Sequence, residues 1–474
     1  MTRSLTLLLA STTLALGACT TDRGPTSVAS ASTAAPAEQP RAKNVILFIG
    51  DGMGISTITA MRIYAGQKQG QTGEEYVLPF ETFGNVALVK TYNVNAQVPD
   101  SAGTATAMHS GEKTNIGVLG IAAAAGHGDC EAALANPLPL LGEEVKERGL
   151  ALGIVSTARI THATPASVYA RSANRDWEAF IIDAATQASS PCKDIATQLV
   201  GGEWDVALGG GTAMFFGSAM GGRRTEADAN LPAEWTARTG GSYVTTAAQL
   251  QAAPMDRPVL GLFSPSHMTY MAEKPADSTE PTLTDMTAQA IARLSDDPDG
   301  FYLMVEGGRI DHGHHAGQAG LALEEGVEFA RAVQYAVDHT DPEETLILVT
   351  ADHSHVFTIA GYPRRGNDIL GLVVPPAGGG EDGSEASDGP ALAADGKPYT
   401  TLGYANGPGA ISGERPIPET GIGAHQQSLV PMGSETHAGE DVALYAQGPG
   451  AVRARGVIEQ NVIYDIIRGA FGWE

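Results

Sequence analysis

The regular alternation of short apolar runs with longer amphipathic stretches constrains the fold of this chain more than any other feature. We predict buried strands at residues 45–49, 151–155, 301–305 and 346–349, and helices near residues 55–64, 140–148 and 321–337. Near-continuous apolar runs of this length are typical of central strands that are covered on both faces. Their alternation with helices predicts an α/β fold with a large, mostly parallel, doubly wound sheet flanked by helices.

Length and charge narrow the class of protein. The 474 residues exceed the usual size of one domain, but large α/β enzymes reach this length around a single extended sheet. The formal net charge of -25 argues against nucleic-acid binding, which needs clustered Lys and Arg. A phosphate-bearing substrate is still compatible with this charge, because bound cations can reverse the local field.

The N-terminal segment, residues 1–19, is predicted to be a signal peptide rather than part of the fold. A single charge at Arg3 precedes an apolar stretch over residues 5–16, which is too short to span a membrane as a helix. The sequence Leu-Gly-Ala before Cys19 resembles the lipobox of bacterial lipoproteins, in which the cysteine is lipidated. An ordinary signal peptide with an incidental cysteine is the alternative. We therefore expect an exported protein on the periplasmic or cell-surface side, anchored to the membrane if Cys19 is lipidated.

Composition divides the rest of the chain. Residues 20–42 are dominated by Ala, Ser, Thr and Pro, which cannot bury enough apolar surface to fold, so we predict a flexible linker. The folded body is predicted to span residues 43–474. Within it, residues 375–418 are rich in Gly, Ala, Pro, Asp and Glu and are predicted to form a crown-like surface insertion. A flexible loop and a small subdomain both fit that composition.

Two cysteines, Cys130 and Cys192, remain after the lipobox. In an exported protein such a pair is expected to form one disulfide. Two buried free thiols are the alternative.

Side chains with catalytic or ligand chemistry follow directly after the predicted strands. Asp51 follows the first run, Glu306 the third, and Asp352 and His353 the fourth. Because ligands of open α/β sheets bind outside the carboxyl ends of the strands, we expect these side chains to converge at one edge. One charge at such a place is more often a solvated loop residue, whereas three together indicate a site.

The densest group of potential metal ligands lies in residues 306–315. Asp311 and His315 are four residues apart, so one helical turn would place both on one face. A carboxylate with an imidazole suits zinc, although a His-rich tract can also store metal. The separate Asp352-His353 pair and the isolated His437 argue against storage, because catalytic sites gather unlike ligands from distant segments.

Ser101 is the candidate nucleophile. The preceding Pro99 and Asp100 predict that a helix begins here, where free N–H groups and the helix dipole favour a phosphoryl anion. A serine that only caps the helix is the alternative. No G-x-S-x-G elbow is present, so a serine-hydrolase triad is not indicated.

Over about residues 43–470 the sequence resembles alkaline phosphatases, and the animal-type members more closely than the enteric bacterial ones. The stretches that carry the resemblance are residues 50–54, 98–107, 174–175, 194–198, 208–211, 306–315, 350–355 and 435–442. The resemblance implies an enzyme that hydrolyses phosphate monoesters to an alcohol and inorganic phosphate through a phosphoserine at Ser101. It also implies a homodimer.

The resemblance assigns a role to individual residues. The first of two zinc ions would be held by Asp311, His315 and His437. The second zinc would be held by Asp51, Asp352, His353 and the Ser101 oxygen. One magnesium ion would be held by Asp51, Glu306 and Thr164. Arg175 would clamp the phosphate with its planar fork. His162 and His312 would stand behind the magnesium ligands, which implies looser magnesium binding and a more alkaline optimum. Cys130 and Cys192 fall where animal-type members carry a disulfide.

The sequence departs from the alkaline phosphatase pattern in two places, and it argues against several other functions. Ser264 stands where an acidic ligand of an additional calcium would be expected, so we expect no calcium site, and the insertion after residue 375 is poorly matched. A sulfatase of the same superfamily would need a modification motif that is not apparent, and a phosphodiesterase would usually lack the magnesium ligands Glu306 and Thr164. A non-catalytic metal- or phosphate-binding lipoprotein would have no use for Ser101 at a helix start.

Overall fold

The computed structural model describes residues 41–180, 190–377 and 389–473. The predicted signal peptide with Cys19, and nearly all of the predicted linker, lie outside the described residues. Among the residues that are described, no helix combines the length and the apolarity that a membrane crossing requires.

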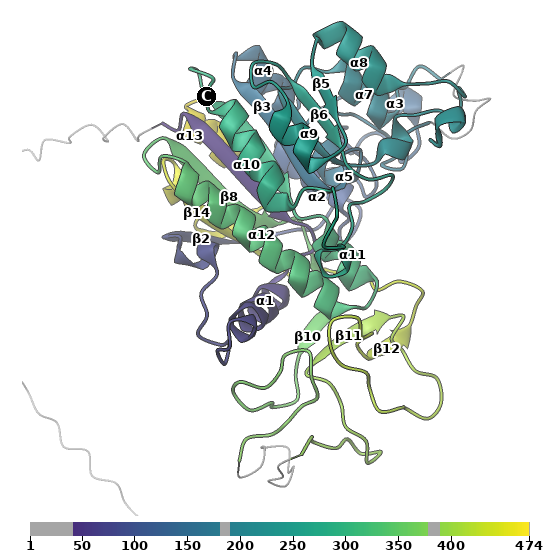
Figure 1. Cartoon of the computed structure of the whole chain (residues 1–474), viewed down its shortest axis with the longest axis vertical. Helices are drawn as coiled ribbons and strands as arrows, with labels where there is room; N and C mark the ends of the chain where they lie inside the picture. The colour runs from purple at the N-terminus through teal and green to yellow at the C-terminus, as the bar shows by residue number, and fades with distance from the viewer. Residues whose placement is uncertain (1–40, 181–189, 378–388, 474) are drawn as a thin grey trace, which may run out of the picture. The chain divides into compact units, whose positions relative to one another are not determined.

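A ten-stranded sheet with the order β15-β2-β14-β8-β1-β7-β3-β4-β6-β5 forms the centre of the molecule (Figure 1). Its strands are β1 (Asn44–Gly50), β2 (Asn85–Lys90), β3 (Ala151–Arg159), β4 (Val206–Gly210), β5 (Ser242–Val244), β6 (Val259–Leu262), β7 (Phe301–Glu306), β8 (Thr345–Ala351), β14 (Val442–Gln447) and β15 (Gly456–Glu459). Within this sheet β14 is antiparallel to both its neighbours, β8 and β2, and the other pairs are parallel. The predicted mostly parallel α/β sheet is confirmed, and each of the four predicted strands lies within an observed one.

Helices cover both faces of the sheet. The longer ones are α1 (Ile55–Lys68), α2 (Ser101–Ser110), α4 (Leu141–Glu147), α8 (Leu231–Thr239), α10 (Leu283–Leu294), α12 (Ala319–His339) and α13 (Val462–Phe471). On β3, a Cβ at Gly153 would meet Leu294 of α10, while the neighbouring Leu152 packs against Gly142 of α4. Successive residues of a strand point to opposite faces, so α10 and α4 lie on opposite sides of the sheet. The core strands are buried on both faces, as their continuous apolar runs predict.

Between β8 and β14 the chain leaves the main sheet and forms two smaller ones. One contains β10 (Phe357–Ile359), β11 (Leu402–Gly407) and β12 (Ser428–Pro431), and the other pairs β9 (Ser354–His355) with β13 (His437–Ala438). The predicted insertion at 375–418 lies inside this longer excursion and includes β11, while residues 378–388 are outside the described part of the chain. Figure 1 shows the excursion below the main sheet, near α1 and α11 (Arg309–His315).

A disulfide joins Cys130, the first residue of α3 (Cys130–Ala135), to Cys192, as expected for an exported protein. The two cysteines pack against a small apolar cluster that includes Val118, Ile121 and Trp177. The disulfide therefore ties the segment before α7 (Ile195–Gly201) to the start of α3.

Candidate metal centre and active site

The carboxyl ends of the central strands β1, β7 and β8 bring Asp51, Glu306 and Asp352 to one edge of the sheet, as predicted. All three side chains are fully buried. Both carboxylate oxygens of Asp51 and Oε1 of Glu306 have no hydrogen-bond partner among the described residues. A buried carboxylate without a partner is unfavourable, so this edge is built to receive positive charge.

The predicted helix start at Ser101 is confirmed, because Ser101 is the first residue of α2. Asp100 caps the helix by accepting a hydrogen bond from the Gly103 N–H at 3.1 Å. Capping therefore does not occupy the Ser101 hydroxyl, whose Oγ lies 3.1 Å from Nε2 of His353. The small side chains of α2 are all buried, which lets the helix N-terminus approach the strand ends closely.

The first group of candidate ligands is Asp311, His315 and His437. Asp311 and His315 share one face of α11, as their spacing predicts, and His437 comes from β13. The Nδ1 atoms of His315 and His437 donate to the backbone carbonyls of Glu435 and Pro99 at 2.6 and 2.8 Å. Their Nε2 atoms therefore carry lone pairs, and these atoms face each other at 3.1 Å. Both also face Oδ1 of Asp311, at 3.4 and 3.3 Å, so only a cation satisfies the group.

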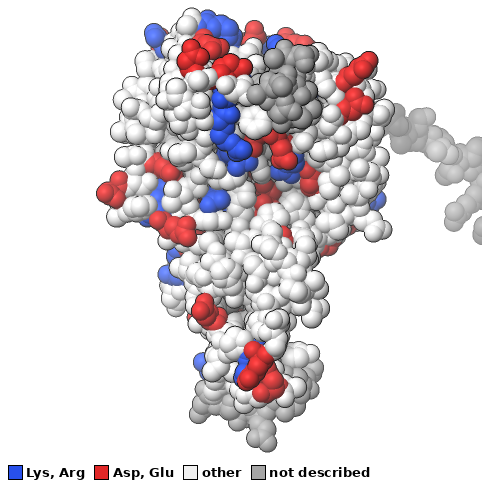
Figure 2. All heavy atoms as spheres, turned by 90° about the vertical axis from the view of Figure 1, so that its right-hand side faces the viewer, with Lys and Arg blue, Asp and Glu red and all other residues white. Residues whose placement is uncertain are grey.

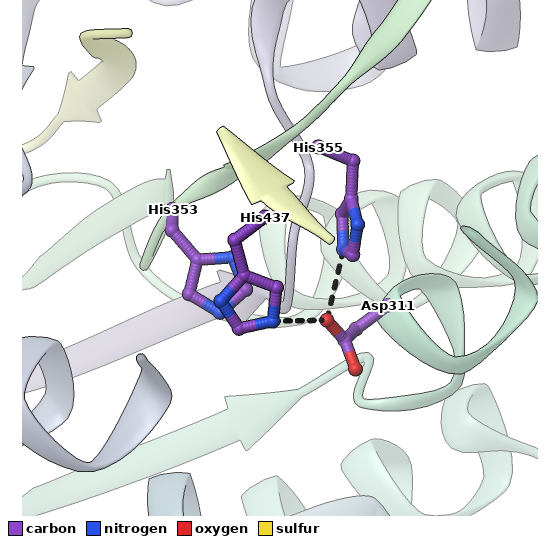
Figure 3. Close-up of side chains that lie close together, drawn as sticks. All are labelled: Asp311, His353, His355 and His437. Atoms are coloured by element: carbon purple, nitrogen blue, oxygen red, sulfur yellow. Dashed lines mark hydrogen bonds and ion pairs between the residues drawn. The ribbon is translucent and has the colours of Figure 1, made fainter. Parts of the chain in front are cut away.

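His355 and Glu435 support this group, and sequence reasoning gave them no role. Figure 3 shows the His355 and His437 rings meeting the same Asp311 carboxylate oxygen from two different directions. His355 donates from Nε2 to Asp311 at 2.8 Å and from Nδ1 to Glu435 at 2.6 Å. Burial alone would lower the pKa of His355, but these two hydrogen bonds raise it to about 10, so the ring is an imidazolium. The available signal was position: His355 and Glu435 each stand two residues from a predicted ligand histidine.

The second group is Asp51, Asp352 and His353. Nε2 of His353 lies 3.4 Å from Oδ1 of Asp51 and 3.3 Å from Oδ2 of Asp352. The other Asp352 oxygen accepts hydrogen bonds from the backbone N–H groups of Gly52 and His353, at 3.0 and 2.9 Å. Gly52 has a φ of +67°, and a Cβ there would lie 2.3 Å from the His355 ring, so glycine is required in this turn.

The third group surrounds Glu306, the last residue of β7. Its Oε2 accepts a short hydrogen bond from the Ser156 hydroxyl of β3, a contact that the sequence did not indicate. The candidate magnesium ligand Thr164, in the short helix α5 (Ala163–Ala166), is buried with no partner for its hydroxyl. Asp51, Glu306 and His162 bring one potential ligand atom each within 4.8 Å of one another. The Glu306 and Asp51 carboxylates therefore lie close together at the ends of two neighbouring strands, β7 and β1.

Arg175 and the two predicted supporting histidines lie beside this third group. The Arg175 guanidinium donates to Asp100 at 3.0 Å and to Nε2 of His162 at 3.1 Å. Asp100 therefore links Arg175 to the start of α2 and to Ser101. The His312 ring lies 5.5 Å from the His162 ring, and Nδ1 of each is buried without a partner. Ser264, which stands away from these groups at the end of β6, donates its hydroxyl to the Ser266 carbonyl at 2.8 Å.

The protonation equilibria show how strongly the centre favours cations. Burial, and then the carboxylates Asp311, Asp352 and Glu306, raise the pKa of Asp51 well above its usual range. Burial likewise raises the pKa of Glu306 to about 7. For His353, burial lowers the pKa well below its usual range, which keeps the ring neutral and able to bind a metal. Imidazole nitrogens and carboxylate oxygens that converge in this way are typical ligands of a bound metal cation.

One face of the molecule carries both kinds of charge. Figure 2 shows Asp and Glu side chains next to Lys and Arg side chains near the middle of one face, rather than in separate patches. A formal charge of -25 on the whole chain therefore does not make this face uniformly negative.

Comparisons with known proteins agree with this geometry. The model of the family described as alkaline phosphatase matches residues 42–472. The tissue-nonspecific isozyme of alkaline phosphatase from Gallus gallus is 44% identical over 446 residues, covering 89% of this chain and 83% of the relative. The Homo sapiens isozyme is 43% identical over 448 residues, covering 89% of this chain and 82% of the relative.

Solved structures share the fold. The alkaline phosphatase of Thermus thermophilus matches with a TM-score of 0.67 and 22% identity, over 92% of this chain and 93% of that one. The enzyme from the Antarctic bacterium TAB5 matches with a TM-score of 0.63 and 23% identity, over 92% of this chain and 100% of that one.

Proposed function

Because the chain belongs to the alkaline phosphatase family, we propose that it hydrolyses phosphate monoesters by transferring the phosphoryl group first to Ser101 and then to water. The family consists of metal-dependent phosphomonoesterases, so the chain is a hydrolase that releases an alcohol and inorganic phosphate. One observation carries the assignment of the nucleophile: Ser101 Oγ lies 3.1 Å from His353 Nε2, beside the buried carboxylates Asp51 and Asp352.

The metal ions of this proposal are two zinc ions and one magnesium ion. Asp311, His315 and His437 would hold the first zinc; Asp51, Asp352, His353 and Ser101 the second; and Asp51, Glu306 and Thr164 the magnesium. The donor sets support this. Nε2 of His315 and of His437 face Asp311, and Nε2 of His353 faces Asp51 and Asp352. Asp51, Glu306 and Thr164 each have a buried oxygen without a hydrogen-bond partner among the described residues. Bound there, the ions would supply Lewis acidity that favours the ionised form of the Ser101 hydroxyl and neutralises charge on the phosphoryl group.

The residues of the chain account for the positioning. In the first step Ser101 Oγ forms a bond to phosphorus while the bond from phosphorus to the alcohol oxygen breaks. The free N–H groups at the start of α2 and the Arg175 guanidinium would hold the remaining phosphoryl oxygens. Asp100 fixes Arg175 with a 3.0 Å ion pair. In the second step water attacks the phosphoserine, inorganic phosphate leaves, and the Ser101 hydroxyl is restored.

The test is hydrolysis of p-nitrophenyl phosphate by the zinc- and magnesium-loaded protein and by Ser101→Ala. Removing the nucleophile should lower kcat by about a thousandfold or more while thermal stability stays unchanged, because Asp51, Asp352 and His353 remain to hold the second zinc. A phosphoserine trapped at low pH should map to the peptide that contains Ser101. Substantial turnover by the variant, or a phosphoenzyme at another residue, would reject the assignment.

We also propose that the protein is exported, tethered through a lipidated Cys19, and dimeric. Support for the tether comes from the lipobox and the linker in the sequence. Exposed apolar side chains on and after β12, with Leu429 81% exposed and Met432 44% exposed, support association with a second copy. Mass spectrometry of the N-terminal peptide tests the tether, since Cys19→Ala should abolish the acyl mass. Light scattering tests the dimer, which Leu429→Glu should weaken.

A further inference from the structure

Beside the proposed magnesium ligands lies a group of basic side chains that the proposed mechanism does not use. We call Arg159, His267, Arg309 and His312 the basic cluster. It forms where three segments meet, namely the end of β3, the loop after β6 and the start of α11. Thr157 of β3 joins them, because its carbonyl accepts from the Met268 N–H at 3.0 Å and its hydroxyl from the Arg309 N–H at 3.2 Å. These main-chain contacts fix the cluster in place.

Arg309 is the arginine of the basic cluster that has no ion-pair partner among the described residues, although the nearby carboxylates of Glu325, Glu273 and Glu280 raise its pKa against the effect of burial. Its guanidinium lies over the Tyr270 ring, with its central carbon 3.5 Å from the ring centroid, and its Nε is buried without a partner. Among the described residues the guanidinium makes no hydrogen bond or ion pair. Among the carboxylates, Glu325 raises the pKa of Arg309 most. Its carboxylate accepts a hydrogen bond from the Met271 N–H at 2.5 Å rather than from Arg309. A half-buried guanidinium without a partner is costly, so the site is built for a ligand with acceptor oxygens.

The surroundings of Arg159 and the histidines indicate which charge that ligand carries. Glu178 neutralises Arg159 through a two-pronged ion pair at 2.8 and 2.6 Å, and the remaining Nη1 points at Nε2 of His267 at 2.5 Å. The His267 and His312 rings lie 4.0 Å apart. Three imidazoles, these two and His162, lie close enough to hold a metal, but Arg159 places a cation against the His267 nitrogen. With Arg309 also unpaired, an anion fits the cluster and a metal ion does not.

The basic cluster adjoins the reaction centre. His162 receives a hydrogen bond from Arg175, and its ring lies 5.3 Å from His267 and 5.5 Å from His312. Nδ1 of His162 and Nδ1 of His312 are buried without partners and remain available as donors. Contacts through His162 therefore connect Arg175 at the reaction centre with His267 and His312 of the basic cluster.

We propose that the basic cluster binds a second phosphate group on the leaving part of the substrate, so that the enzyme favours short-chain bisphosphates over the corresponding monophosphates. Arg309 is the residue that contacts this second phosphate, and His312 positions it. The inference rests on the proposed function, because it concerns the substrate of the same site.

The test compares KM and kcat for propanediol to hexanediol bisphosphates with those for alkyl monophosphates of equal length, using the full metal-loaded chain. A charge-assisted contact to Arg309 should lower KM for the best bisphosphate by about tenfold or more. Arg309→Gln should remove this advantage and leave kcat and KM for the monophosphates unchanged. Arg257→Gln is the matched control, because it deletes the same charge from an exposed loop with half of its side chain accessible.

Inhibition of the wild-type protein tests ligand binding by the basic cluster independently of binding at the reaction centre. This test does not require that a variant protein folds. In the wild-type protein, butane bisphosphonate should inhibit about tenfold more strongly than butylphosphonate. Inorganic phosphate, which fills the reaction centre alone, should inhibit wild type and Arg309→Gln equally. Equal inhibition by the two phosphonates would overturn the inference.

The kinetic measurements also distinguish failure of the second-phosphate proposal from failure of the proposed function. If wild type hydrolyses both substrate classes with equal KM, or if Arg309→Gln weakens both equally, the basic cluster does not bind a second phosphate, although the proposed function stands. If the metal-loaded protein hydrolyses neither class, the proposed function itself fails. Zinc content per chain should be the same in wild type and His267→Asn, and loss of one zinc would assign the three histidines to a metal.

Discussion

The acidic centre around Ser101 and the basic cluster beside it occupy the same edge of the sheet, yet they are built for ligands of opposite charge. In the acidic centre, Asp51, Asp311, Asp352 and Glu306 surround imidazoles whose Nε2 lone pairs point inward. In the basic cluster, the imidazole of His267 faces a guanidinium at 2.5 Å. The same residue type therefore serves a cation in one place and an anion a few ångströms away. The neighbours of an imidazole, more than its presence, decide which ligand it serves.

Asp311→Asn should have the largest effect, because it attacks the acidic centre where three histidines converge. Oδ1 of Asp311 lies 2.8 Å from His355, 3.3 Å from His437 and 3.4 Å from His315. An amide lacks the charge that this arrangement needs, so kcat/KM for p-nitrophenyl phosphate should fall by about a thousandfold, with loss of one zinc per chain. Asp338→Asn on the exposed side of α12 is the control. Wild-type turnover in Asp311→Asn would show that the acidic centre is not the reaction centre.

Chelation tests the same contrast through stability. Removing the cations leaves the buried carboxylates of Asp51, Asp352 and Glu306 facing one another, and it also removes the stabilisation by binding. That stabilisation amounts to about 4 kcal/mol for an ion present at a thousand times its Kd. Calorimetry should therefore show a Tm that falls by several degrees with EDTA and recovers with zinc and magnesium. A Tm that does not change on chelation would contradict a metal-filled acidic centre.

Glu325→Gln probes a buried carboxylate that acts on Arg309 of the basic cluster. Burial raises the pKa of Glu325 from 4.5 to about 7, against the opposing effects of the Met271 N–H and Arg309. Between these two pH values the folded state retains a proton that the unfolded state releases. The stability that neutral Glu325 contributes is therefore present at acidic pH and is lost as pH rises through this window, by an amount on the order of 3 kcal/mol.

Denaturant unfolding across this pH window checks the prediction. The free energy of unfolding of the wild type should fall more steeply with rising pH than that of Glu325→Gln. Glu324→Gln is the matched control, because Lys68 and Tyr64 hold the pKa of Glu324 below its usual value despite burial. That substitution should leave the slope unchanged. Identical slopes for wild type and Glu325→Gln would show that Glu325 is already ionised beside Arg309.

The smallest effect is expected at Glu459, which gives the baseline for a charge in neither region. Glu459 pairs with Lys90 and Lys113, each at 2.9 Å, and about a third of its side chain is exposed. Exposed pairs of this kind contribute about 0 to 1 kcal/mol, so the urea midpoint of Glu459→Gln should hardly move. A much larger loss would mean that the effects in the acidic centre and the basic cluster cannot be ascribed to burial.

The sequence predicted the central strands well and the outer ones poorly. Residues 45–49 and 346–349 are long apolar runs, and both belong to strands that are buried on each face. β4 and β6 are short and contain glycine, so neither stands out from its surroundings. The antiparallel direction of β14 depends on how the chain returns from the excursion, which no local pattern encodes.

In the site too, the features that depend on neighbouring residues in the sequence were predicted, and those that depend on distant residues were not. The positions of Asp311 and His315 on one helical face followed from their spacing, and the start of α2 followed from Asp100. By contrast, the role of His355 depends on Glu435, eighty residues away, and that of Arg309 depends on Tyr270. These pairs meet only after the sheet has formed, so they were not visible in the sequence.

The place of β2 in the sheet makes this end of the sheet depend on distant segments. β2 pairs with β14 on one side and with β15 on the other, and both partners lie far from β2 in the sequence. Until residues 442–459 are in place, β2 has both edges open, and an open strand edge is a template for pairing with another chain. His437, in β13 just before β14, belongs to the same segment. Residues 437–459 therefore close this part of the sheet and complete the ligand set together, so a chain that lacked them would have neither.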